Sequence, residues 1–375
     1  MEKISRRSFL KASAIVASAV ALTACGDSGE SPANNPAGGD SSAAGATGIK
    51  AGVFYYNFAD AYITTVRTAL DKQLTDAGIA FDNFDAQTNQ GQQMDQINTA
   101  ITNGVNLLIV NIVETSSPDA AKQVVKAAQD AGIPVIFFNR AVEDSIIQSY
   151  DRCAFVGTDA PEAGHMQGEM IGDYLTANFE KTDLNGDGKI SYVMFKGQEG
   201  NDEAEFRTKF AVEDANKKLV AAGLPELVFY DDKNADKFLV DPTGAWSAQA
   251  ATDYMNTILA SYTEANNNMV ELIIANNDGM AEGAIAALQA LGYNTGKEGS
   301  TTIPVYGVDA MDSALDKIAK NQMTGTVKQD GEAMAATIAT LVKNVNDGAD
   351  LLANTENYNF KEGVNKINVP YAKMS

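Results

Sequence analysis

Short apolar runs alternate with amphipathic segments along most of the chain after residue 48. The runs are unbroken stretches rich in Val, Ile, Leu and Phe rather than alternating patterns, which is typical of strands buried on both faces. Several amphipathic segments close on a glycine, such as Gly78, Gly132 and Gly223, where a left-handed residue can end a helix. The apolar runs are residues 49–56, 105–113, 133–138, 155–157, 190–195, 227–230, 270–275 and 303–308. The pattern predicts an α/β fold of doubly wound parallel sheets with helices on both faces.

The first 24 residues have the composition of an export signal. A basic start with the pair Arg6-Arg7 precedes an apolar run that is too short to span a bilayer. This pair before Phe9-Leu10 looks like a twin-arginine signal, with the general export route as the alternative. Leu22-Thr23-Ala24-Cys25 resembles the bacterial lipoprotein box, whose cysteine is acylated, unless the cysteine is incidental to a plain secretory signal. We expect an exported protein, either periplasmic or tethered to the outer face of the cytoplasmic membrane through lipid on Cys25.

Composition separates a tether from two domains. Residues 25–48 lack aromatic and large aliphatic side chains, so they cannot bury a core and are expected to form a flexible tether. Residues 49–375 are sufficient for two ordinary domains.

Charge and rare residues exclude several classes of function. The formal net charge is −21, and removal of residues 1–24, with four basic and one acidic side chain, makes it −24. Such a surface repels phosphate backbones and anionic lipid, which argues against nucleic-acid binding and against membrane contact other than through a lipid anchor. His165 is the single histidine, so multi-histidine metal sites are excluded. Cys153 lies in an apolar run and is expected to be a buried thiol.

Polar side chains follow almost every predicted strand. Asn111 follows the apolar residues 107–110, Asn277 and Asp309 come just after apolar runs, and Asp60 and Tyr62 follow the first run. The carboxyl ends of parallel strands form the edge at which open α/β sheets bind their ligands. Helix capping is the alternative role of these amides and carboxylates, but ligand contact is favoured for Asn111, Asn277 and Asp309.

This combination of amides, carboxylates and aromatic rings suits a polyhydroxylated ligand. Each sugar hydroxyl donates and accepts hydrogen bonds, and the C–H faces of a sugar pack on aromatic rings. Trp246 is the only tryptophan and lies in a turn with Pro and Gly, which favours a position in a cleft. Tyr62 would be its partner, with core packing as the alternative. No dinucleotide-binding or P-loop motif is present in the sequence.

Residues 183–191 match the beginning of a calcium-binding loop. The twelfth position of that pattern is Met194 in place of a bidentate glutamate, and the exit reads as a strand, so an EF-hand is excluded. A last carboxylate would have to come from elsewhere in the chain, and a solvated turn without metal is the alternative. The expected Ca²⁺ ligands in the loop are Asp183, Asn185, Asp187, the carbonyl of Lys189, and Ser191.

These motifs together resemble those of the periplasmic sugar-binding protein family over nearly all of residues 49–375. The resemblance is carried by Phe137-Phe138-Asn139-Arg140, Val156-Gly157-Thr158-Asp159, Asp183–Ile190, Ile274-Ala275-Asn276-Asn277-Asp278, Gly307-Val308-Asp309-Ala310 and Gly325-Thr326-Val327. It implies two lobes joined by three crossings. The first lobe would be residues 49–157 plus 329–367, and the second residues 158–328 plus 368–375.

The resemblance also implies a function. The protein would not be an enzyme but a monomeric receptor that holds a monosaccharide, such as a glucose- or galactose-like hexose, between its lobes. It would deliver the sugar to the permease of an ABC importer, with a chemoreceptor as a further partner. The sugar would stack between Tyr62 and Trp246, and Glu271 would complete a structural Ca²⁺ site. The implied sugar-binding residues are Asp60, Tyr62, Asn111, Asn201, Glu203, Arg207, Trp246, Asn277, Asp309 and Gln329.

Four positions depart from the family pattern. Tyr62, Asn201, Glu203 and Gln329 stand where the family has phenylalanine, histidine, aspartate and asparagine. A different hexose, a pentose, an inositol or a furanone signal therefore stays open as the ligand. A sugar-active enzyme would need paired carboxylates, for which Asp60, Glu203 and Asp309 are the candidates. A repressor of this fold would need a DNA-binding segment where the export signal lies.

Overall fold

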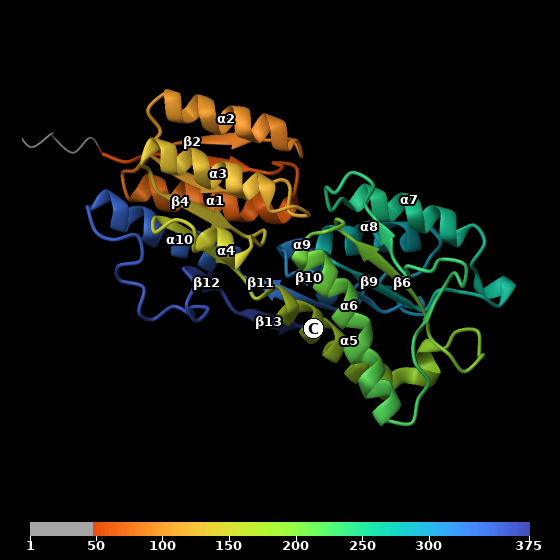
Figure 1. Cartoon of the computed structure of the whole chain (residues 1–375). Helices are drawn as coiled ribbons and strands as arrows, with labels where there is room; N and C mark the ends of the chain where they lie inside the picture. The colour runs from red at the N-terminus through yellow and green to blue at the C-terminus, as the bar shows by residue number, and fades with distance from the viewer. Residues whose placement is uncertain (1–47) are drawn as a thin grey trace, which may run out of the picture. The chain divides into compact units, whose positions relative to one another are not determined.

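The computed structural model describes residues 48–375 (Figure 1). The export signal, Cys25 and nearly all of the tether lie outside the described residues. Among residues 48–375, none of the helices is long and apolar enough to cross a membrane.

The first of two sheets is entirely parallel. Its strand order is β12-β5-β4-β3-β1-β2, and β1 pairs with β2 and β3 in register, with Val53 opposite both Asn83 and Ile109. The strands are β1 (Lys50–Tyr55), β2 (Ala80–Asp85), β3 (Leu107–Val110), β4 (Val135–Phe138), β5 (Cys153–Gly157) and β12 (Lys366–Asn368). We call this sheet and its helices the first lobe.

Helices cover both faces of this sheet because successive strand residues are apolar on both sides. Leu107 and Ile109 of β3 pack into one core cluster with α1 and α10, while Leu108 and Val110 pack into another with α2 and α3. Each apolar run is therefore unbroken, as buried parallel strands require. The helices are α1 (Ala61–Asp76), α2 (Gln90–Thr102), α3 (Asp119–Ala131), α4 (Asp144–Ile147) and α10 (Gly331–Asn346).

The second sheet has the order β13-β11-β10-β9-β6-β7, with β8 also paired to β6. Only β13 runs antiparallel to its neighbour, β11. The strands are β6 (Ser191–Lys196), β7 (Val228–Phe229), β8 (Leu239–Val240), β9 (Leu272–Ala275), β10 (Val305–Asp309), β11 (Gly325–Gln329) and β13 (Tyr371–Met374).

Helices α5 and α6 share a core cluster on one face of this sheet, and α7 and α8 share a cluster on the other. The helices are α5 (Ala160–Thr182), α6 (Asp202–Ala221), α7 (Ala248–Leu259), α8 (Asp278–Ala290) and α9 (Asp312–Ala319), with a 3₁₀ turn at Glu264–Asn266. This sheet and its helices form the second lobe.

The chain passes between the two sheets three times. It leaves the first sheet after β5 to enter α5, returns after β11 to form α10, and leaves again between β12 and β13. Helix α10 packs against α1, far from it in sequence, through residues such as Met334 and Ile338. Each lobe is therefore built from discontinuous stretches of chain.

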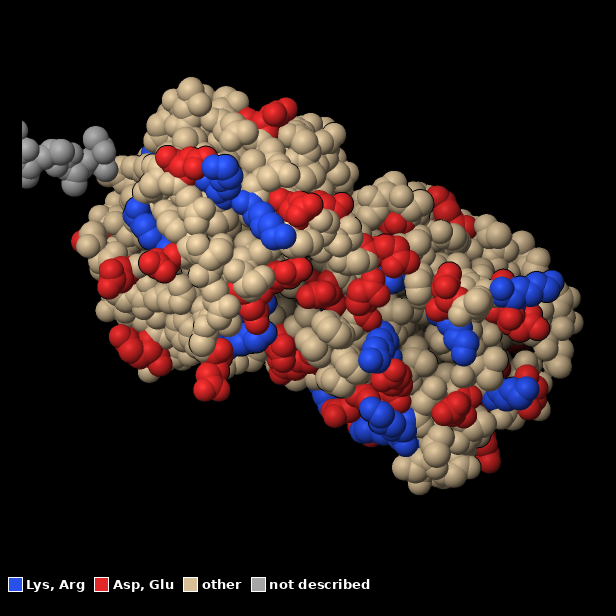
Figure 2. Space-filling model, in the orientation of Figure 1, with Lys and Arg blue, Asp and Glu red and all other residues tan. Residues whose placement is uncertain are grey.

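The predicted fold class is confirmed: every apolar run overlaps a strand of a parallel, doubly wound sheet. The pattern did not reveal β2, because this edge strand is only partly buried and carries Asp82, Asn83 and Asp85. Cys153 is a free, buried thiol, as predicted. Figure 2 shows acidic side chains spread over both lobes on the face displayed, in keeping with the negative charge.

Candidate ligand-binding site

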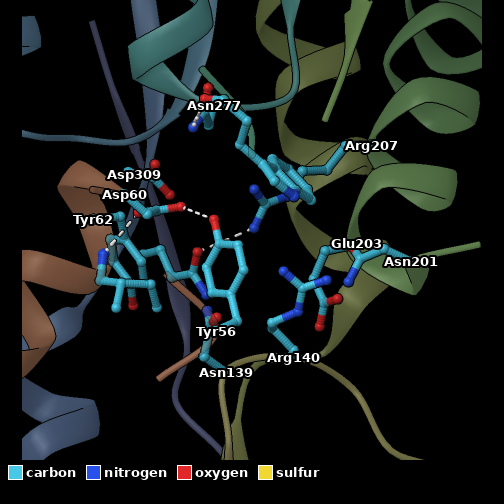
Figure 3. Close-up of a pocket in the computed structure, with 13 residues that line it drawn as sticks. Tyr56, Asp60, Tyr62, Asn139, Arg140, Asn201, Glu203, Arg207, Asn277 and Asp309 are labelled. Atoms are coloured by element: carbon cyan, nitrogen blue, oxygen red, sulfur yellow. Dashed lines mark hydrogen bonds between the residues drawn. The ribbon is translucent and has the colours of Figure 1, made fainter. Parts of the chain in front are cut away.

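Loops at the carboxyl ends of strands from both sheets line one pocket (Figure 3). From the first lobe, the β1–α1 segment supplies Tyr56, Asp60, Tyr62 and Ile63, and the end of β4 supplies Asn139 and Arg140. From the second lobe come Asn201, Glu203, Arg207, Trp246, Asn277, Asp309 and Gln329. Residues more than 250 positions apart thus converge on one space.

Nine of the ten sequence-predicted binding residues line this pocket, and Asn111 does not. Asn111 is fully buried. Its amide oxygen accepts from the backbone N–H of Tyr56 at 3.3 Å, and its amide nitrogen donates to the Phe138 carbonyl at 3.2 Å and to Asn139 Oδ1 at 3.1 Å. Asn111 therefore supports the residues that reach the pocket instead of lining it.

Tyr56 and Arg140 also line the first lobe's side of the pocket, although neither is among the ten predicted binding residues. The Tyr56 hydroxyl donates to Asp60 Oδ2, and the Arg140 guanidinium lies 4.2 Å from the centre of the Tyr56 ring. Arg140 also donates to the Val113 carbonyl at 3.1 Å and to Gln198 of the second lobe. Arg140 is the second residue after β4, so its position near a strand end is the signal that points to it.

Asp60 has two tasks at once. It caps helix α1, since its Oδ1 accepts from the Ile63 N–H at 2.8 Å, and its other oxygen faces Tyr56 and the pocket. Burial raises the pKa of Asp60 above its ordinary value, and the hydrogen bonds from Tyr56 and Ile63 oppose that rise. Asn277 similarly caps α8 through Met280 N–H at 2.8 Å while it lines the pocket. Capping and a position in the pocket are therefore compatible.

Arg207 is the central cation of the second lobe's side. It is 3 % exposed and donates to the Asn276 carbonyl at 2.8 Å, to Gln329 Oε1 at 3.1 Å and to the Tyr371 hydroxyl at 3.0 Å. Burial raises the pKa of Asp309 well above its ordinary value, although the positive charge of Arg207 opposes the rise. Glu203 accepts from the backbone N–H of Ala141 at 3.2 Å, a contact between the two lobes.

Several buried polar atoms at the pocket have no hydrogen-bond partner among the described residues. They are Arg140 Nε, Glu203 Oε2, Arg207 Nε and Gln329 Nε2. Each such group costs about 1–3 kcal/mol when it stays unpaired. Three lining residues, Asn139, Trp246 and Asp309, also have positive φ angles of 62°, 57° and 124°. Unpaired polar atoms and strained backbone together mark this pocket as a binding site for a polar ligand.

Comparisons with known proteins agree with this geometry. A family model described as periplasmic binding protein domain matches residues 51–350. The D-galactose/methyl-galactoside binding periplasmic protein of Haemophilus influenzae is 34 % identical over 334 residues, which is 89 % of this chain and 91 % of that protein. The chain belongs to the periplasmic binding protein family.

Solved structures of periplasmic binding proteins share the fold. A solute binding protein from Clostridium phytofermentans with bound β-D-glucose has a TM-score of 0.67 at 22 % identity, covering 87 % of this chain and 94 % of that one. One from Bacillus halodurans with bound myo-inositol has a TM-score of 0.65 at 24 % identity, with the same shares covered. The predicted family membership is confirmed, and, as a member of this family of binding proteins, the chain is not an enzyme.

A twin-arginine translocation signal model matches residues 3–23, so this periplasmic binding protein carries an export signal, as predicted. The match lies outside the described residues and does not bear on acylation of Cys25.

The predicted calcium loop forms a compact turn before β6. Asp183 accepts from the backbone N–H groups of Gly186 at 2.7 Å and Gly188 at 2.9 Å. The almost fully buried Glu271 reaches this loop from its distant position and accepts from the N–H groups of Leu184 at 2.7 Å and Ser191 at 2.9 Å. The carboxylate and amide oxygen atoms of this loop are ligands that suit a hard cation. Within residues 48–375, however, no three His, Cys, Asp or Glu side chains converge in the arrangement of a metal site.

Proposed function

We propose that the protein is a receptor that binds a glucose- or galactose-like hexose in the pocket between its lobes. The observation that carries the proposal is the set of buried donors and acceptors without a partner among the described residues, on the pocket-lining residues Arg140, Glu203, Arg207 and Gln329. A neutral ligand with many hydroxyl groups can donate to the carboxylate and accept from the nitrogen groups in the same space.

The aromatic side chains support a sugar over other small polar ligands. Tyr62 comes from the first lobe and Trp246 from the second, and both line the pocket. Rings on two sides can cover the apolar C–H faces of a pyranose while its hydroxyls meet charged and amide groups. The galactose-binding relative supports a hexose as the ligand. In contrast, the name of an Escherichia coli relative specifies D-xylose, and one solved neighbour holds myo-inositol. A pentose, an inositol or a furanone is therefore the competing ligand class.

Binding would couple to closure of the lobes. Ligand contacts from both sides exist together only when the lobes are closed, so the sugar favours that state. We infer that the protein is a monomer at the outer face of the cytoplasmic membrane and that its lobes divide at residues 157/158, 328/329 and 367/368. The closed form would be presented to an ABC importer permease and also to a chemoreceptor.

The test is calorimetric titration of residues 49–375 with D-glucose, D-galactose, D-xylose and myo-inositol. We expect a hexose to bind most tightly, and Asp309→Asn to weaken its binding, because Asp309 lines the pocket and Arg207 would lose its charged neighbour. Asp312→Asn, at an exposed carboxylate three residues later, is the matched control. Tight binding of xylose or inositol with no heat from either hexose would overturn the hexose assignment. Absence of heat with every sugar would overturn sugar binding itself.

We further propose that the loop of residues 183–191 and Glu271 hold a structural Ca²⁺ ion. The support is the match to the first half of a calcium loop and the arrival of the buried Glu271 carboxylate at its amides. Thermal unfolding with excess Ca²⁺ and with a chelator is the test. We expect a lower melting temperature in chelator, and identical curves would leave a solvated turn as the correct description.

We also propose that Cys25 is acylated after export. The support is the Leu22-Thr23-Ala24-Cys25 sequence, followed by a polar tether. Detergent phase partitioning of the exported full-length protein should place it in the detergent phase, and Cys25→Ser should move it to the aqueous phase. Partitioning of both proteins into water would mean that the signal is a plain secretory one.

A further inference from the structure

The side chain of Trp246 lies in a loop that makes four hydrogen bonds to one carboxylate. This Trp246 loop comprises residues 241–247, between β8 and α7. Asp241 is 3 % exposed and does not line the pocket. The Oδ1 atom of Asp241 accepts from the Thr243 N–H at 2.8 Å and from the Thr243 hydroxyl at 2.7 Å. The Oδ2 atom accepts from the Ser247 N–H at 2.8 Å and from the Ser247 hydroxyl at 2.7 Å.

These four bonds join the residues on both sides of Trp246 to a single point. The base of the loop is fixed as well, because the Asp241 N–H donates to the Lys196 carbonyl at 2.9 Å. Ser247 in turn caps α7 by accepting from Ala250 N–H at 3.2 Å. The loop is thereby closed onto itself, which lets Trp246 keep the left-handed backbone conformation that a bulky residue rarely adopts.

The indole ring itself rests on a glycine. A Cβ atom added to Gly197, at the end of β6, would overlap with the fused ring atoms of Trp246. The φ angle of Gly197 is not in the left-handed region, so the glycine is required here for close approach rather than for backbone conformation. From another side, the Asn277 amide donates to the Trp246 carbonyl at 3.2 Å.

We propose that Asp241 and Gly197 are positioning residues that fix the orientation of the Trp246 ring as a rigid stacking platform for the ligand. This inference deepens the proposed hexose site and rests on it for the effect on affinity. Neither residue touches the pocket, so each would act only through Trp246. A rigid platform binds more tightly because its side chain does not have to be ordered when the ligand arrives.

The experiment uses Trp246 as its own reporter, since it is the only tryptophan in the chain. Acrylamide quenching and near-ultraviolet circular dichroism are measured without ligand on Gly197→Ala and Asp241→Asn. We expect increased quenching and a weaker indole dichroism band in both variants. Gly91→Ala, in α2 of the other lobe, and Asp236→Asn, at an exposed carboxylate, are the matched controls and should leave both signals unchanged. Unchanged signals in Gly197→Ala and Asp241→Asn would overturn the proposal.

The effect on binding is tested by a double-mutant cycle with Trp246→Leu and D-glucose or D-galactose. Asp241→Asn should weaken hexose affinity by about tenfold in the wild-type background, from loss of aromatic stacking. It should have no further effect in the Trp246→Leu background, because the platform is already absent. Equal loss in both backgrounds would mean that Asp241 has a general structural role and would overturn the inference. If the wild-type protein binds no sugar, the hexose proposal fails, while the spectroscopic measurements still decide whether these residues orient the ring.

Discussion

The pocket and the loop of residues 183–191 both gather carboxylates and amides, but they differ in where their hydrogen bonds go. In the loop, Asp183 and Glu271 accept from nearby backbone N–H groups, and Gly186, Asp187 and Gly188 are exposed. At the pocket, buried nitrogen and oxygen atoms of Arg207 and Glu203 have no partner among the described residues. Similar residue types therefore have different roles. In the loop, the carboxylates find hydrogen-bond partners within the protein, whereas at the pocket some polar atoms have no such partner and a ligand can supply it.

The difference also appears in the energetics. Unpaired groups at the pocket and its positive-φ residues lower the stability of the ligand-free protein, so a bound sugar should stabilise the fold as well as fill the pocket. A cation at the loop would instead add to hydrogen bonds that are already made. Variants in one region should consequently leave the response of the other region unchanged, and the predictions below are designed to test that independence.

The largest effect is expected from Arg207→Met. This change removes three hydrogen bonds and the positive charge that opposes the rise in the pKa of the buried Asp309. Loss of one partner of such a buried group costs about 2–5 kcal/mol, or roughly 30-fold to several thousand-fold in hexose affinity measured by calorimetry. The exposed neighbour Lys209→Met is the control. Retained affinity in a folded Arg207→Met protein would show that the pocket is not the sugar site, and the calcium response should persist in this variant.

The second prediction concerns Glu271→Gln in the loop. If Ca²⁺ binds there, a free Ca²⁺ concentration of 100 times the dissociation constant stabilises the wild type by about 2.7 kcal/mol. The variant lacks the anionic oxygen and should lose most of that stabilisation in chemical unfolding curves. Its hexose affinity should match the wild type, because Glu271 is not a pocket residue. Reduced sugar binding together with an intact calcium response would contradict the separation of the two regions.

The third prediction is a pH dependence from the buried Asp278, which is next in sequence to the pocket residue Asn277. Burial raises the pKa of Asp278 to about 7, against the effect of hydrogen bonds from Thr326 and Met311. Because the folded state then binds a proton that the unfolded state releases above about pH 4, stability falls as the pH rises from about 4 to 7.

Asp278→Asn removes that proton, so the slope of unfolding free energy against pH should change by at most about 1.4 kcal/mol per pH unit within this window. Urea unfolding at intervals of half a pH unit is the measurement. An identical slope in the variant and the wild type would mean that Asp278 is ionised in the folded protein throughout.

Much of the fold and of the site could be predicted from the sequence because parallel strands buried on both faces leave a strong pattern. Ile109, for example, lies in an unbroken apolar run, and the polar residues after such runs reach one edge by topology alone. Strand β8 was not predicted, since two half-buried residues between loops carry no periodicity.

The direction of individual side chains could not be predicted in this way. Asn111 is the first residue after β3 and Asn277 is the second after β9, and only Asn277 lines the pocket. The Asn111 side chain is buried, because its amide bonds the backbone of Tyr56 and Phe138. For Tyr56 the error is the opposite one, since a residue that reads as core lines the pocket. It ends an apolar run and its ring is buried, so it reads as core, although its hydroxyl faces Asp60 at the pocket.

Tyr56→Phe gives the smallest predicted effect and tests that last point. Loss of the hydroxyl removes one hydrogen bond to Asp60, which should weaken hexose binding by about 0.5–1.5 kcal/mol. The same bond lowers the pKa of Asp60, so its loss raises that pKa. As the pH falls, Asp60 should therefore be protonated earlier in the variant, and the hexose affinity should begin to decline at a higher pH than in the wild type. Tyr55→Phe is the matched control, because the buried Tyr55 hydroxyl has no partner among residues 48–375 and its removal should leave affinity unchanged. Equal behaviour of the two variants in calorimetric titrations from pH 5 to 8 would show that Tyr56 is a core residue, as the sequence pattern indicates, and that its hydroxyl plays no part in the pocket.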